Sequence, residues 1–520
     1  MSSSAASLRS GLTIALGRAA RLAARLRGGG SGGTALPGLV MEKTDPGFLR
    51  RTLDQLPLGV VVVSGTNGKT TTTKMVVELL TAQGLKVLTN RTGSNFVRGV
   101  LASLLTEVDA VGRLDADVAV LELDEAHAVR FVRRVRPRAA LLLNVMRDQL
   151  DRFGEIDYTA SLLHKVAVAT TDAVVVNADD PRLSGPAFFK GVRARTAAFG
   201  AGSGLRSLFV SDDDLRTGSA APAETPDAPA ETPDAPTPAD DAPAADAPAP
   251  VSAPRACPAP RVVLESLQGR GAVVRVDGTD HEVSFAIPGV HNQLNACAAL
   301  ALALEVLGEK ADVDSLLAAL ARVRAAFGRG EVLTLDGRDV ELSLVKNPAG
   351  FRMGLLTAEQ AVAARGAETV MIAINDEYAD GRDMSWLWDV DFTCLRGEGV
   401  AVVTGVRAWD MALRLRYDEV PIGVVEPDLG KALALLRRAP DVVTGAGADK
   451  SAGANAGAGE EAAAADGADK DAGAGADKDA TAETGTAPSN RPMRVFTTYT
   501  AMLALRARLG ELTEVEEVMK

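Results

Sequence analysis

The chain has 520 residues, a hydrophobic fraction of 47% and a formal net charge of −12. This length suits roughly two to four domains with sizeable cores and excludes a chain that is disordered throughout. Segments 211–256 and 441–490 carry charges of −8 and −7, so the rest of the chain is nearly neutral, which excludes the basic surface of a typical DNA-binding protein.

Residues 1–45 form a basic segment in which arginines are separated by alanine and leucine: Arg9, Arg18, Arg21, Arg25 and Arg27. No uninterrupted apolar run in it is long enough for a signal sequence or a membrane span. We expect a surface helix on the first domain. The alternative is a basic amphipathic helix that touches anionic lipid.

Apolar runs then alternate with helical patterns from residue 46 to residue 332. The runs at 59–64, 117–123, 138–145 and 172–178 are continuous stretches of valine, leucine and alanine. Such runs are typical of parallel strands that are buried on both faces. We therefore predict an α/β domain at 46–332, interrupted at 211–256 by a disordered Pro- and Ala-rich insert that repeats the heptad PAETPDA.

The first run continues into a glycine-rich loop and a helix, VVVVSGTNGKTTTTKMVVELL, at residues 60–80. Glycines let successive backbone amides face an anion, the lysine adds positive charge, and the start of the helix adds its dipole. Only two residues separate Gly65 from Gly68, whereas the common P-loop has four. We predict a nucleotide-binding loop made of Thr66, Asn67, Gly68, Lys69, Thr70 and Thr71.

Carboxylates follow the next strands at the same edge of the predicted sheet. Glu122 and Asp124 end the run at 117–123, and Asp148, Gln149 and Asp151 follow the run at 138–145. Open α/β sheets bind ligands at this edge, and Mg²⁺ prefers oxygen ligands. Thr70 and Glu122 are therefore the predicted Mg²⁺ ligands.

A second alternation of apolar runs and helices begins at residue 333, after a helical pattern at 292–308. It contains TVMIAIND, GVAVVTG, VPIGVVE and RVFTTYT. We predict a C-terminal α/β domain at 333–520 with a second disordered insert at 444–490, so that the last strand lies beyond this insert.

Several motifs occur in the order and spacing of one family: GTNGKTTTT, LELDEAH, NVMRDQLDRFG, NADDPR, IPGVHNQLNACAALA and FGRGE. The chain resembles the Mur ligases, ATP-dependent amide ligases of peptidoglycan assembly. The resemblance implies that Lys69 and Thr70 serve the β- and γ-phosphates of ATP and Mg²⁺, and that Glu122 binds a metal. It further implies that Asn292 and Asn295 contact adenine and that Arg329 lies at the nucleotide.

The chain departs from the family pattern at three places. Gln149 replaces a histidine, and the usual carbamylated lysine has no clean counterpart among Leu162, His164 and Lys165. A four-cysteine zinc ribbon of many relatives is also missing, since Cys257, Cys297 and Cys394 lie far apart without a CxxC pair. We therefore expect no zinc, and the cysteine usage fits a reducing cytoplasm.

The C-terminal motifs LVKNPAGF, INDEYADGRDMSWLWDVDF and TTYTAML resemble the MurT subfamily, the ligase subunits of lipid II isoglutaminyl synthases. This resemblance implies that ATP activates the D-glutamate α-carboxylate of lipid II as an acyl phosphate. Ammonia from a GatD-like glutamine amidotransferase partner would then form D-isoglutamine. It also implies a cytoplasmic protein, with peripheral membrane contact through the lipid substrate at the inner face of the membrane.

The amidotransferase partner is expected to borrow one catalytic carboxylate from this chain. The loop NDEYADGRD offers Asp376, Asp380 and Asp383. We favour Asp380 because the following glycine allows a tight turn that presents its side chain outward, and Asp383 is next. Trp386 and Trp388 are expected as strand neighbours on one face, at an interface or in the core.

Two other functions stay open at this point. An amino-acid-adding enzyme of the Mur or folylpolyglutamate type would work without a glutaminase partner. A catalytically weak nucleotide-binding scaffold would explain Gln149 and the missing lysine, and it would show no ATP turnover with partner and lipid II.

Overall fold

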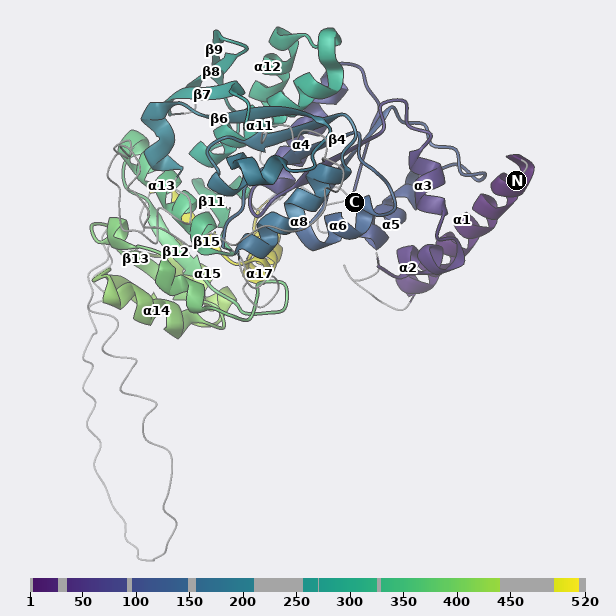
Figure 1. The fold of residues 1–520 in the computed structure, drawn as a ribbon. Helices are drawn as coiled ribbons and strands as arrows, with labels where there is room; N and C mark the ends of the chain where they lie inside the picture. Colours follow the sequence, from purple (N-terminus) through teal and green to yellow (C-terminus); the bar gives the residue numbers. More distant parts are fainter. Residues whose placement is uncertain are drawn as a thin grey trace, which may run out of the picture. The chain divides into compact units, whose positions relative to one another are not determined.

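The structure is a computed structural model that describes residues 3–26, 35–90, 96–147, 156–209, 256–269, 271–324, 329–439 and 491–513 (Figure 1). The predicted inserts at 211–256 and 444–490 lie outside these residues, except for residue 256. The chain divides into two compact units. Unit 1 comprises Met1–Met146, Glu155–Ser284 and Gln293–Arg322, and unit 2 comprises Arg147–Gly154, Phe285–Asn292 and Val323–Lys520.

Unit 1 is built on a nine-stranded sheet with the order β2-β3-β1-β4-β5-β6-β7-β8-β9. Its strands are β1 Val60–Ser64, β2 Val87–Thr89, β3 Val118–Glu122, β4 Ala139–Leu142, β5 Ala173–Asn177, β6 Arg195–Ala201, β7 Pro260–Gln268, β8 Gly271–Val276 and β9 Thr279–Ser284. Pairing is parallel from β2 across to β7 and antiparallel from β7 to β9. Every residue of β1, β3, β4 and β5 is buried, which confirms the parallel sheet predicted from the continuous apolar runs.

Three helices of unit 1 precede the first strand: α1 Ser3–Leu26, α2 Ala35–Thr44 and α3 Phe48–Leu53. The others follow strands: α4 Lys69–Ala82, α5 Val97–Glu107, α6 Glu125–Val132, α8 Ile156–Ala169, α9 Pro181–Ser184 and α12 Val313–Arg322, with the 3₁₀ turns η2 Pro186–Phe189, η3 Ser203–Leu208 and η4 Gly308–Lys310. The long helix α11, Val290–Leu307, begins in unit 2 and runs into unit 1. The stretch Val290–Lys310, which contains α11, is long and apolar enough to cross a membrane. However, 89% of its apolar part is buried inside the protein, so α11 is a core helix.

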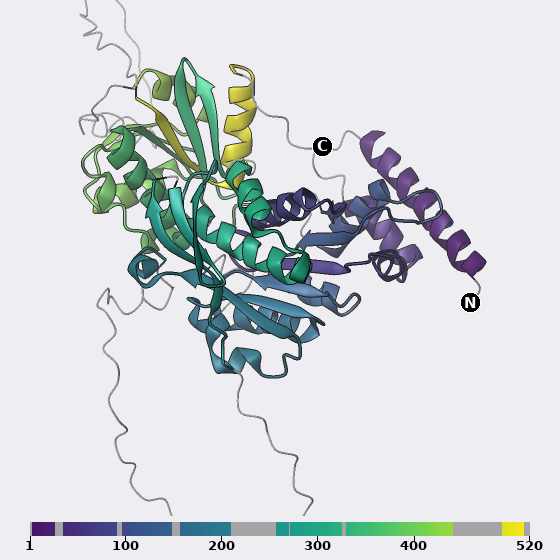
Figure 2. The same ribbon diagram turned by 90° about the horizontal axis from the view of Figure 1, so that it is seen from above.

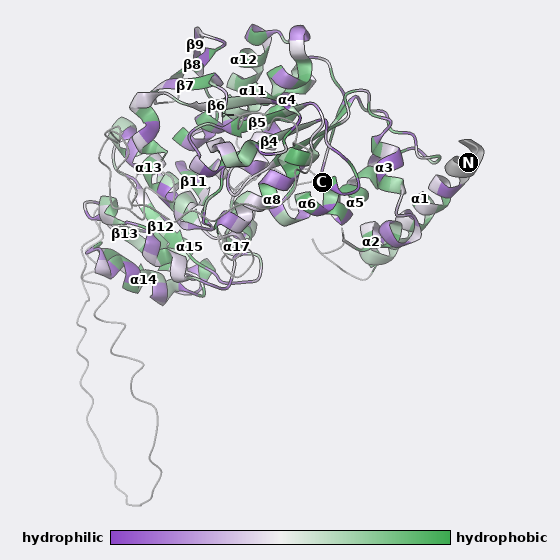
Figure 3. Ribbon diagram, in the orientation of Figure 1, coloured by the Kyte–Doolittle hydropathy of each residue, from purple (hydrophilic) through white to green (hydrophobic). Residues whose placement is uncertain are grey.

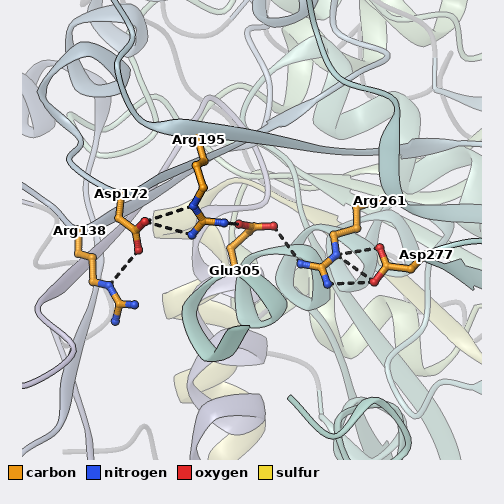
Figure 4. Close-up of polar contacts among 6 residues, drawn as sticks. All are labelled: Arg138, Asp172, Arg195, Arg261, Asp277 and Glu305. Carbon is orange, nitrogen blue, oxygen red and sulfur yellow. Dashed lines mark hydrogen bonds and ion pairs between the residues drawn. The ribbon is translucent and has the colours of Figure 1, made fainter. Parts of the chain in front are cut away.

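An unbroken chain of ion pairs joins the amino ends of four neighbouring strands in unit 1 (Figure 4). Asp172 pairs with Arg138 at 3.1 Å and with Arg195 at 3.1 Å. Glu305 of α11 then accepts from Arg195 at 2.8 Å and from Arg261 at 2.9 Å, and Arg261 also pairs with Asp277. Although burial alone would raise it, the hydrogen bonds and charges of Arg195 and Arg138 lower the pKa of Asp172.

Unit 2 contains a six-stranded sheet with the order β10-β11-β15-β12-β13-β14. Its elements are β10 Arg329–Leu335, β11 Arg338–Leu344, α13 Pro348–Arg365, β12 Thr369–Ala373, η5 Ser385–Asp389, η6 Thr393–Leu395, β13 Val400–Thr404, α14 Ala408–Tyr417, β14 Ile422–Val425, α15 Leu429–Arg437, β15 Met493–Thr497 and α17 Tyr499–Gly510. Alternate residues of the inner strands enter two separate apolar clusters, with Ile372 in one and Met371 in the other. Both faces of this sheet are therefore covered, and the inner strands are coloured hydrophobic in Figure 3.

The strand β15 lies between β11 and β12 and carries a fully buried arginine. Arg494 donates to Glu341 of β11 at 2.7 and 2.9 Å and to Glu368, the residue before β12. These carboxylates compensate the buried guanidinium, whose desolvation would otherwise be costly. The three side chains join β15 to the strands on each side of it.

We predict that Glu305→Gln lowers the free energy of unfolding by about 1–2 kcal/mol, because Glu305 is buried and accepts from two arginines. Urea unfolding followed by circular dichroism measures the change. The matched control is Glu309→Gln, an exposed glutamate just past the end of α11, which should change stability by less than about 0.5 kcal/mol. Equal effects of the two substitutions would contradict a structural role for the ion-pair chain.

Candidate functional site

The loop between β1 and α4 is held by residues that follow β4. The backbone amide of Thr66 donates to the Asn144 carbonyl oxygen at 3.0 Å. The backbone amide of Asn67 donates to Asn144 Oδ1 at 2.8 Å. In return, Asn144 Nδ2 donates to the Asn67 carbonyl at 3.1 Å, and Met146 N donates to Thr66 Oγ1 at 3.1 Å. Since β1 and β4 are parallel neighbours, the two loops leave the sheet side by side and fix each other's shape.

Two glycines of this loop have positive φ, as the sequence predicted for a turn that exposes amides. Gly65 has φ +134° and Gly68 has φ +84°. A Cβ atom at Gly68 would lie 2.6 Å from Asn295 Oδ1, so the amide side chain of Asn295 on α11 rests directly against the loop. The glycine is needed both for its backbone angle and for this close approach.

Lys69, the first residue of α4, is buried beneath the loop. Its Nζ donates to the Gly65 carbonyl at 2.6 Å and lies 3.3 Å from Asp124 and 3.7 Å from Glu125. A buried ammonium group requires such partners. The lysine is thus positioned at the loop by backbone oxygens and by two carboxylates at the start of α6.

Thr70 and Glu122, the predicted Mg²⁺ ligands, are in direct contact. Thr70 Oγ1 donates to Glu122 Oε1 at 2.7 Å, and both residues are buried. Asn90 fixes the backbone of Glu122 with two hydrogen bonds. The Glu122 backbone amide donates to Asn90 Oδ1 at 2.8 Å, and Asn90 Nδ2 donates to the Glu122 carbonyl at 2.8 Å. A hydroxyl and a carboxylate suit Mg²⁺, because this ion is usually held by one or two protein side chains together with oxygens of the substrate phosphates. Among the described residues, no group of three or more His, Cys, Asp and Glu side chains could hold a metal ion.

The remaining predicted residues of the nucleotide site are placed as follows. Thr71 is buried in the first turn of α4. Asn292 belongs to unit 2 and donates to the Pro288 carbonyl at 2.6 Å. The Arg329 side chain and residues 148–155, with Asp148, Gln149 and Asp151, lie outside the described residues. The roles of all these residues at a nucleotide stay predictions.

The His164 side chain lies against a neighbouring segment of unit 1. Its Nε2 is 2.8 Å from the Lys190 carbonyl, and its ring contacts Phe188. Leu162 is buried on the same helix and Lys165 is exposed. The histidine is thus engaged in packing α8 against η2.

Four residues that hold the site together received no role in the sequence analysis: Asn90, Glu125, Asn144 and Asp180. Asp180 accepts backbone hydrogen bonds from Val145 at 2.6 Å and from Arg182 and Leu183 at the start of α9. The signals were present, because Asn144 is the polar residue near the end of the run at 138–145 and Asp180 lies within the NADD motif. A strand-end asparagine, however, has no role that is visible before the strand order is known.

A second group of polar side chains lies at the carboxyl edge of the unit 2 sheet, in the loop after β12. The expectation that Asp380 points outward is wrong, because its side chain is fully buried. Asp380 accepts from the Thr500 amide at 2.7 Å, from the Thr500 hydroxyl and from the Glu377 amide. Burial raises its pKa, and the hydrogen bonds from Thr500 oppose this rise. The tight turn itself is present, since Gly381 has φ +86°.

The other two aspartates of this loop are partly exposed. Asp376 accepts from Arg407 Nε at 2.9 Å. Asp383 accepts from the Ser385 amide at 2.9 Å, and hydrogen bonds from Ser385 lower the pKa of its carboxyl group. Asp383 is therefore an ionised carboxylate at the surface of unit 2, whereas Asp380 fixes the loop.

The two tryptophans after the loop do not share a face. They lie in the 3₁₀ helix η5, where residues two apart point in different directions, so Trp386 is buried and Trp388 is 49% exposed. Trp388 contacts Tyr417 of α14, with ring centroids 5.0 Å apart. Tyr417 continues an exposed stripe along α14 that also contains Trp409 and Leu413. We call these four residues the aromatic patch of unit 2.

Comparison with known proteins gives consistent matches in sequence and fold. Residues 63–217 match the Mur ligase middle domain, and residues 344–442 match the family described as MurT ligase C-terminal. The chain is 30% identical over 398 residues to the lipid II isoglutaminyl synthase (glutamine-hydrolyzing) subunit MurT of Streptococcus pneumoniae, covering 75% of this chain and 83% of that protein. It is 27% identical over 437 residues to the protein of the same name from Staphylococcus aureus, covering 82% and 92%.

Solved structures share the fold at low sequence identity. MurF from Acinetobacter baumannii superposes with a TM-score of 0.58 at 16% identity, covering 92% of this chain and 81% of that chain. MurF ligase from Thermotoga maritima, crystallised in complex with ADP, has a TM-score of 0.55 at 15% identity, covering 90% and 83%. These likenesses confirm the predicted α/β architecture.

We predict that Gly68→Ala weakens the binding of ATP by at least about tenfold, because the added methyl group collides with Asn295 and the positive φ is strained. Calorimetric titration with ATP measures the change. Gly84→Ala is the matched control, since Gly84 has φ +81° just past the other end of α4 with nothing within 4 Å of an added Cβ. Both variants carry the strain of a positive φ, and only the first adds a collision and should lose affinity for ATP. Equal affinities would exclude the loop as the nucleotide site.

A second prediction concerns pH. Burial raises the pKa of Asp180 from 3.8 to about 6, against the opposing effect of its three backbone hydrogen bonds. The folded chain therefore binds this proton more tightly than the unfolded chain, so stability from this group is present below the unfolded pKa and is lost as the pH rises through about 6. Asp180→Asn should remove this loss.

The variant should gain about 2–3 kcal/mol relative to the unaltered chain between pH ~4 and pH ~7. Urea unfolding of both chains across this range measures the difference. A difference that stays constant with pH would show that Asp180 is ionised in the folded chain as readily as in the unfolded chain.

Proposed function

Since the chain belongs to the MurT family of Mur-type ligases, we propose that it is the ATP-dependent ligase subunit of a glutamine-hydrolysing lipid II isoglutaminyl synthase. The relatives of this name place the family in the amidation of lipid II in peptidoglycan synthesis. The single observation that carries the proposal for this chain is the glycine loop over buried Lys69, with Thr70 and Glu122 in contact beside it. We assign ATP binding to unit 1 on this observation.

The proposed reaction activates a poor electrophile in two steps. An oxygen of the D-glutamate α-carboxylate attacks the γ-phosphorus of ATP, the bond to ADP breaks, and an acyl phosphate forms. Ammonia then attacks the carbonyl carbon and loses a proton, and phosphate leaves with the electrons of the carbon–oxygen bond. The products are D-isoglutamine in the stem peptide, ADP and phosphate.

The chain's own residues would lower the activation free energy mainly by stabilising the charge on the transferred phosphoryl group. The loop amides and the start of α4 would face the phosphates, and Lys69 would supply a compact positive charge. Phosphate oxygens would compete with Asp124 and Glu125 for its ammonium group. Mg²⁺ would neutralise phosphate charge, and Thr70 and Glu122 would hold it.

Ammonia is proposed to come from a GatD-like glutamine amidotransferase that lacks its own third catalytic group. Asp383 is the best candidate for that group, because its carboxylate is ionised and partly exposed, and Asp380 is second because it is buried under Thr500. The aromatic patch of unit 2 begins at Trp388, shortly after this loop in sequence, and continues through Tyr417 along α14. It suits a protein partner because aromatic side chains dominate interface energetics. We place the enzyme in the cytoplasm, at the inner face of the membrane where its lipid-linked substrate is available.

The test is coupled turnover of the full chain with a candidate amidotransferase, ATP, Mg²⁺ and lipid II, with the product followed by mass spectrometry. Each variant is assayed with glutamine and, in a parallel set, with ammonium. Lys69→Ala should lose at least about 100-fold activity in both sets, because phosphoryl transfer is common to them. Asp383→Asn should lose only the glutamine-driven activity, because ammonium bypasses the partner.

Asp339→Asn is the control for Asp383→Asn, since Asp339 is an exposed aspartate of the same unit on β11, outside this loop and the aromatic patch. If Asp380→Asn alone shows the selective loss of glutamine-driven turnover, the loop rearranges in the complex and Asp380 takes the role. No amide from ammonium and ATP with the unaltered chain would reject the ligase function in favour of a scaffold. Amide formation from an added amino acid without the partner would favour an amino-acid-adding ligase.

A further inference from the structure

The helix α1 exposes an apolar stripe to solvent. Leucines on its outer side have exposed fractions of 65% for Leu12, 39% for Leu16, 59% for Leu22 and 80% for Leu26. Ala15, Ala19 and Ala23 are exposed between them. Because residues three or four apart share a helix face, these seven residues form one continuous surface, which we call the leucine stripe.

The opposite side of α1 anchors the helix to unit 1. Ile14 is buried, and Gly17 lies so close to α2 and α5 that an added Cβ would be 3.0 Å from Met41 and 3.1 Å from Leu105. Thr13 is buried beside Asp45. In Figures 1 and 2, α1 lies at the edge of unit 1 with these helices on one side only. The leucine stripe is therefore held outward by a well-packed inner face.

The charges of α1 are all positive. Ser3–Leu26 contains Arg9, Arg18, Arg21 and Arg25 and no acidic residue, and the first acidic residue of the chain is Glu42. Arg9 is 49% exposed although it lies 3.3 Å from Asp45. Arg18 is exposed and donates to the Val108 carbonyl, a partner that does not neutralise its charge. An apolar stripe with basic neighbours is the composition of a helix that lies in a membrane interface.

We propose that α1 docks unit 1 on an anionic lipid surface, with the leucine stripe inserted among the acyl chains and Arg9 and Arg18 at the phosphate groups. A second copy of the chain is a poorer occupant, since α1 carries no acidic residue that could pair with the arginines of another α1. The docking gives the proposed enzyme access to a lipid-linked substrate, but the binding itself needs neither ATP nor substrate. This proposal rests on the proposed function only in the reason for docking, which is access to a lipid-linked substrate.

The experiment is co-sedimentation of the full chain with vesicles free of lipid II. We expect binding to vesicles of equal parts phosphatidylglycerol and phosphatidylcholine, weaker binding as salt increases, and no binding to phosphatidylcholine alone. Leu12→Ser with Leu22→Ser should raise the lipid concentration for half-binding by at least about tenfold. Leu435→Ser with Leu503→Ser is the matched control, because these exposed leucines of unit 2 have exposed fractions of 39% and 38%.

A second readout does not depend on a loss of binding. Leu22→Trp places a fluorophore in the leucine stripe, and its emission should shift to shorter wavelength with anionic vesicles and be quenched by brominated lipid. Absence of vesicle binding by the unaltered chain, or equal loss in both double variants, would overturn the proposal. A change in the oligomeric mass of the Leu12, Leu22 variant without a change in vesicle binding would do the same and assign the stripe to a protein contact.

Turnover in detergent separates this proposal from the proposed function. The Leu12, Leu22 variant should keep full activity on lipid II in detergent micelles and lose activity on lipid II in vesicles. Lys69→Ala should lose activity in both and bind vesicles like the unaltered chain. If the unaltered chain binds vesicles but has no ligase activity, the docking surface stands and the proposed reaction falls.

Discussion

The parallel pairing of β1 with β3 and β4 is the constraint on which the proposed nucleotide site depends. In this arrangement, the carboxyl ends of three strands open at one edge, so segments far apart in sequence supply one site. Glu122 from β3 thereby reaches Thr70, and Asn144 after β4 holds the loop after β1. The ion-pair chain of Figure 4 lies at the amino ends of the same sheet, away from these residues, and can stabilise the strands without taking part in the chemistry.

The two units use charge in different ways. Unit 1 buries Lys69 among a loop carbonyl and the carboxylates at the start of α6, and the proposed function requires a phosphate to compete with these oxygens. In unit 2, Arg494 is surrounded by two glutamates in a closed arrangement that suits structure alone. The loop after β12 combines both uses, because Asp380 is committed to Thr500 while Asp383 keeps an accessible charge.

Sequence patterns predicted the architecture well because buried parallel strands have a strong local signature. The runs at 59–64 and 138–145 could be recognised as strands without any knowledge of their neighbours. The turn between β1 and α4 was also predictable, since its two glycines lie within a few residues of each other. Predictions failed where a side chain's direction depends on distant partners. Asp380 looked like an exposed turn residue because Thr500, which buries it, lies 120 residues later. Trp386 and Trp388 were placed on one face because η5 has no clear sequence signal. The mutual support of Asn144 and the loop required the strand order, which periodicity does not give.

The position of β15 has a consequence for how the protein is made. This strand is the last of the six in unit 2 along the chain, yet it occupies the third position in the sheet, between β11 and β12. During synthesis, β11 and β12 therefore leave the ribosome before the strand that separates them. The Glu341 and Glu368 carboxylates do not meet Arg494 until β15 has been made. Unit 1, whose strands all precede residue 285, can complete its sheet first. Unit 2 must leave a gap open between two apolar strands until β15 arrives, which makes this half of the nascent chain the one that needs protection from aggregation and from premature pairing of β11 with β12.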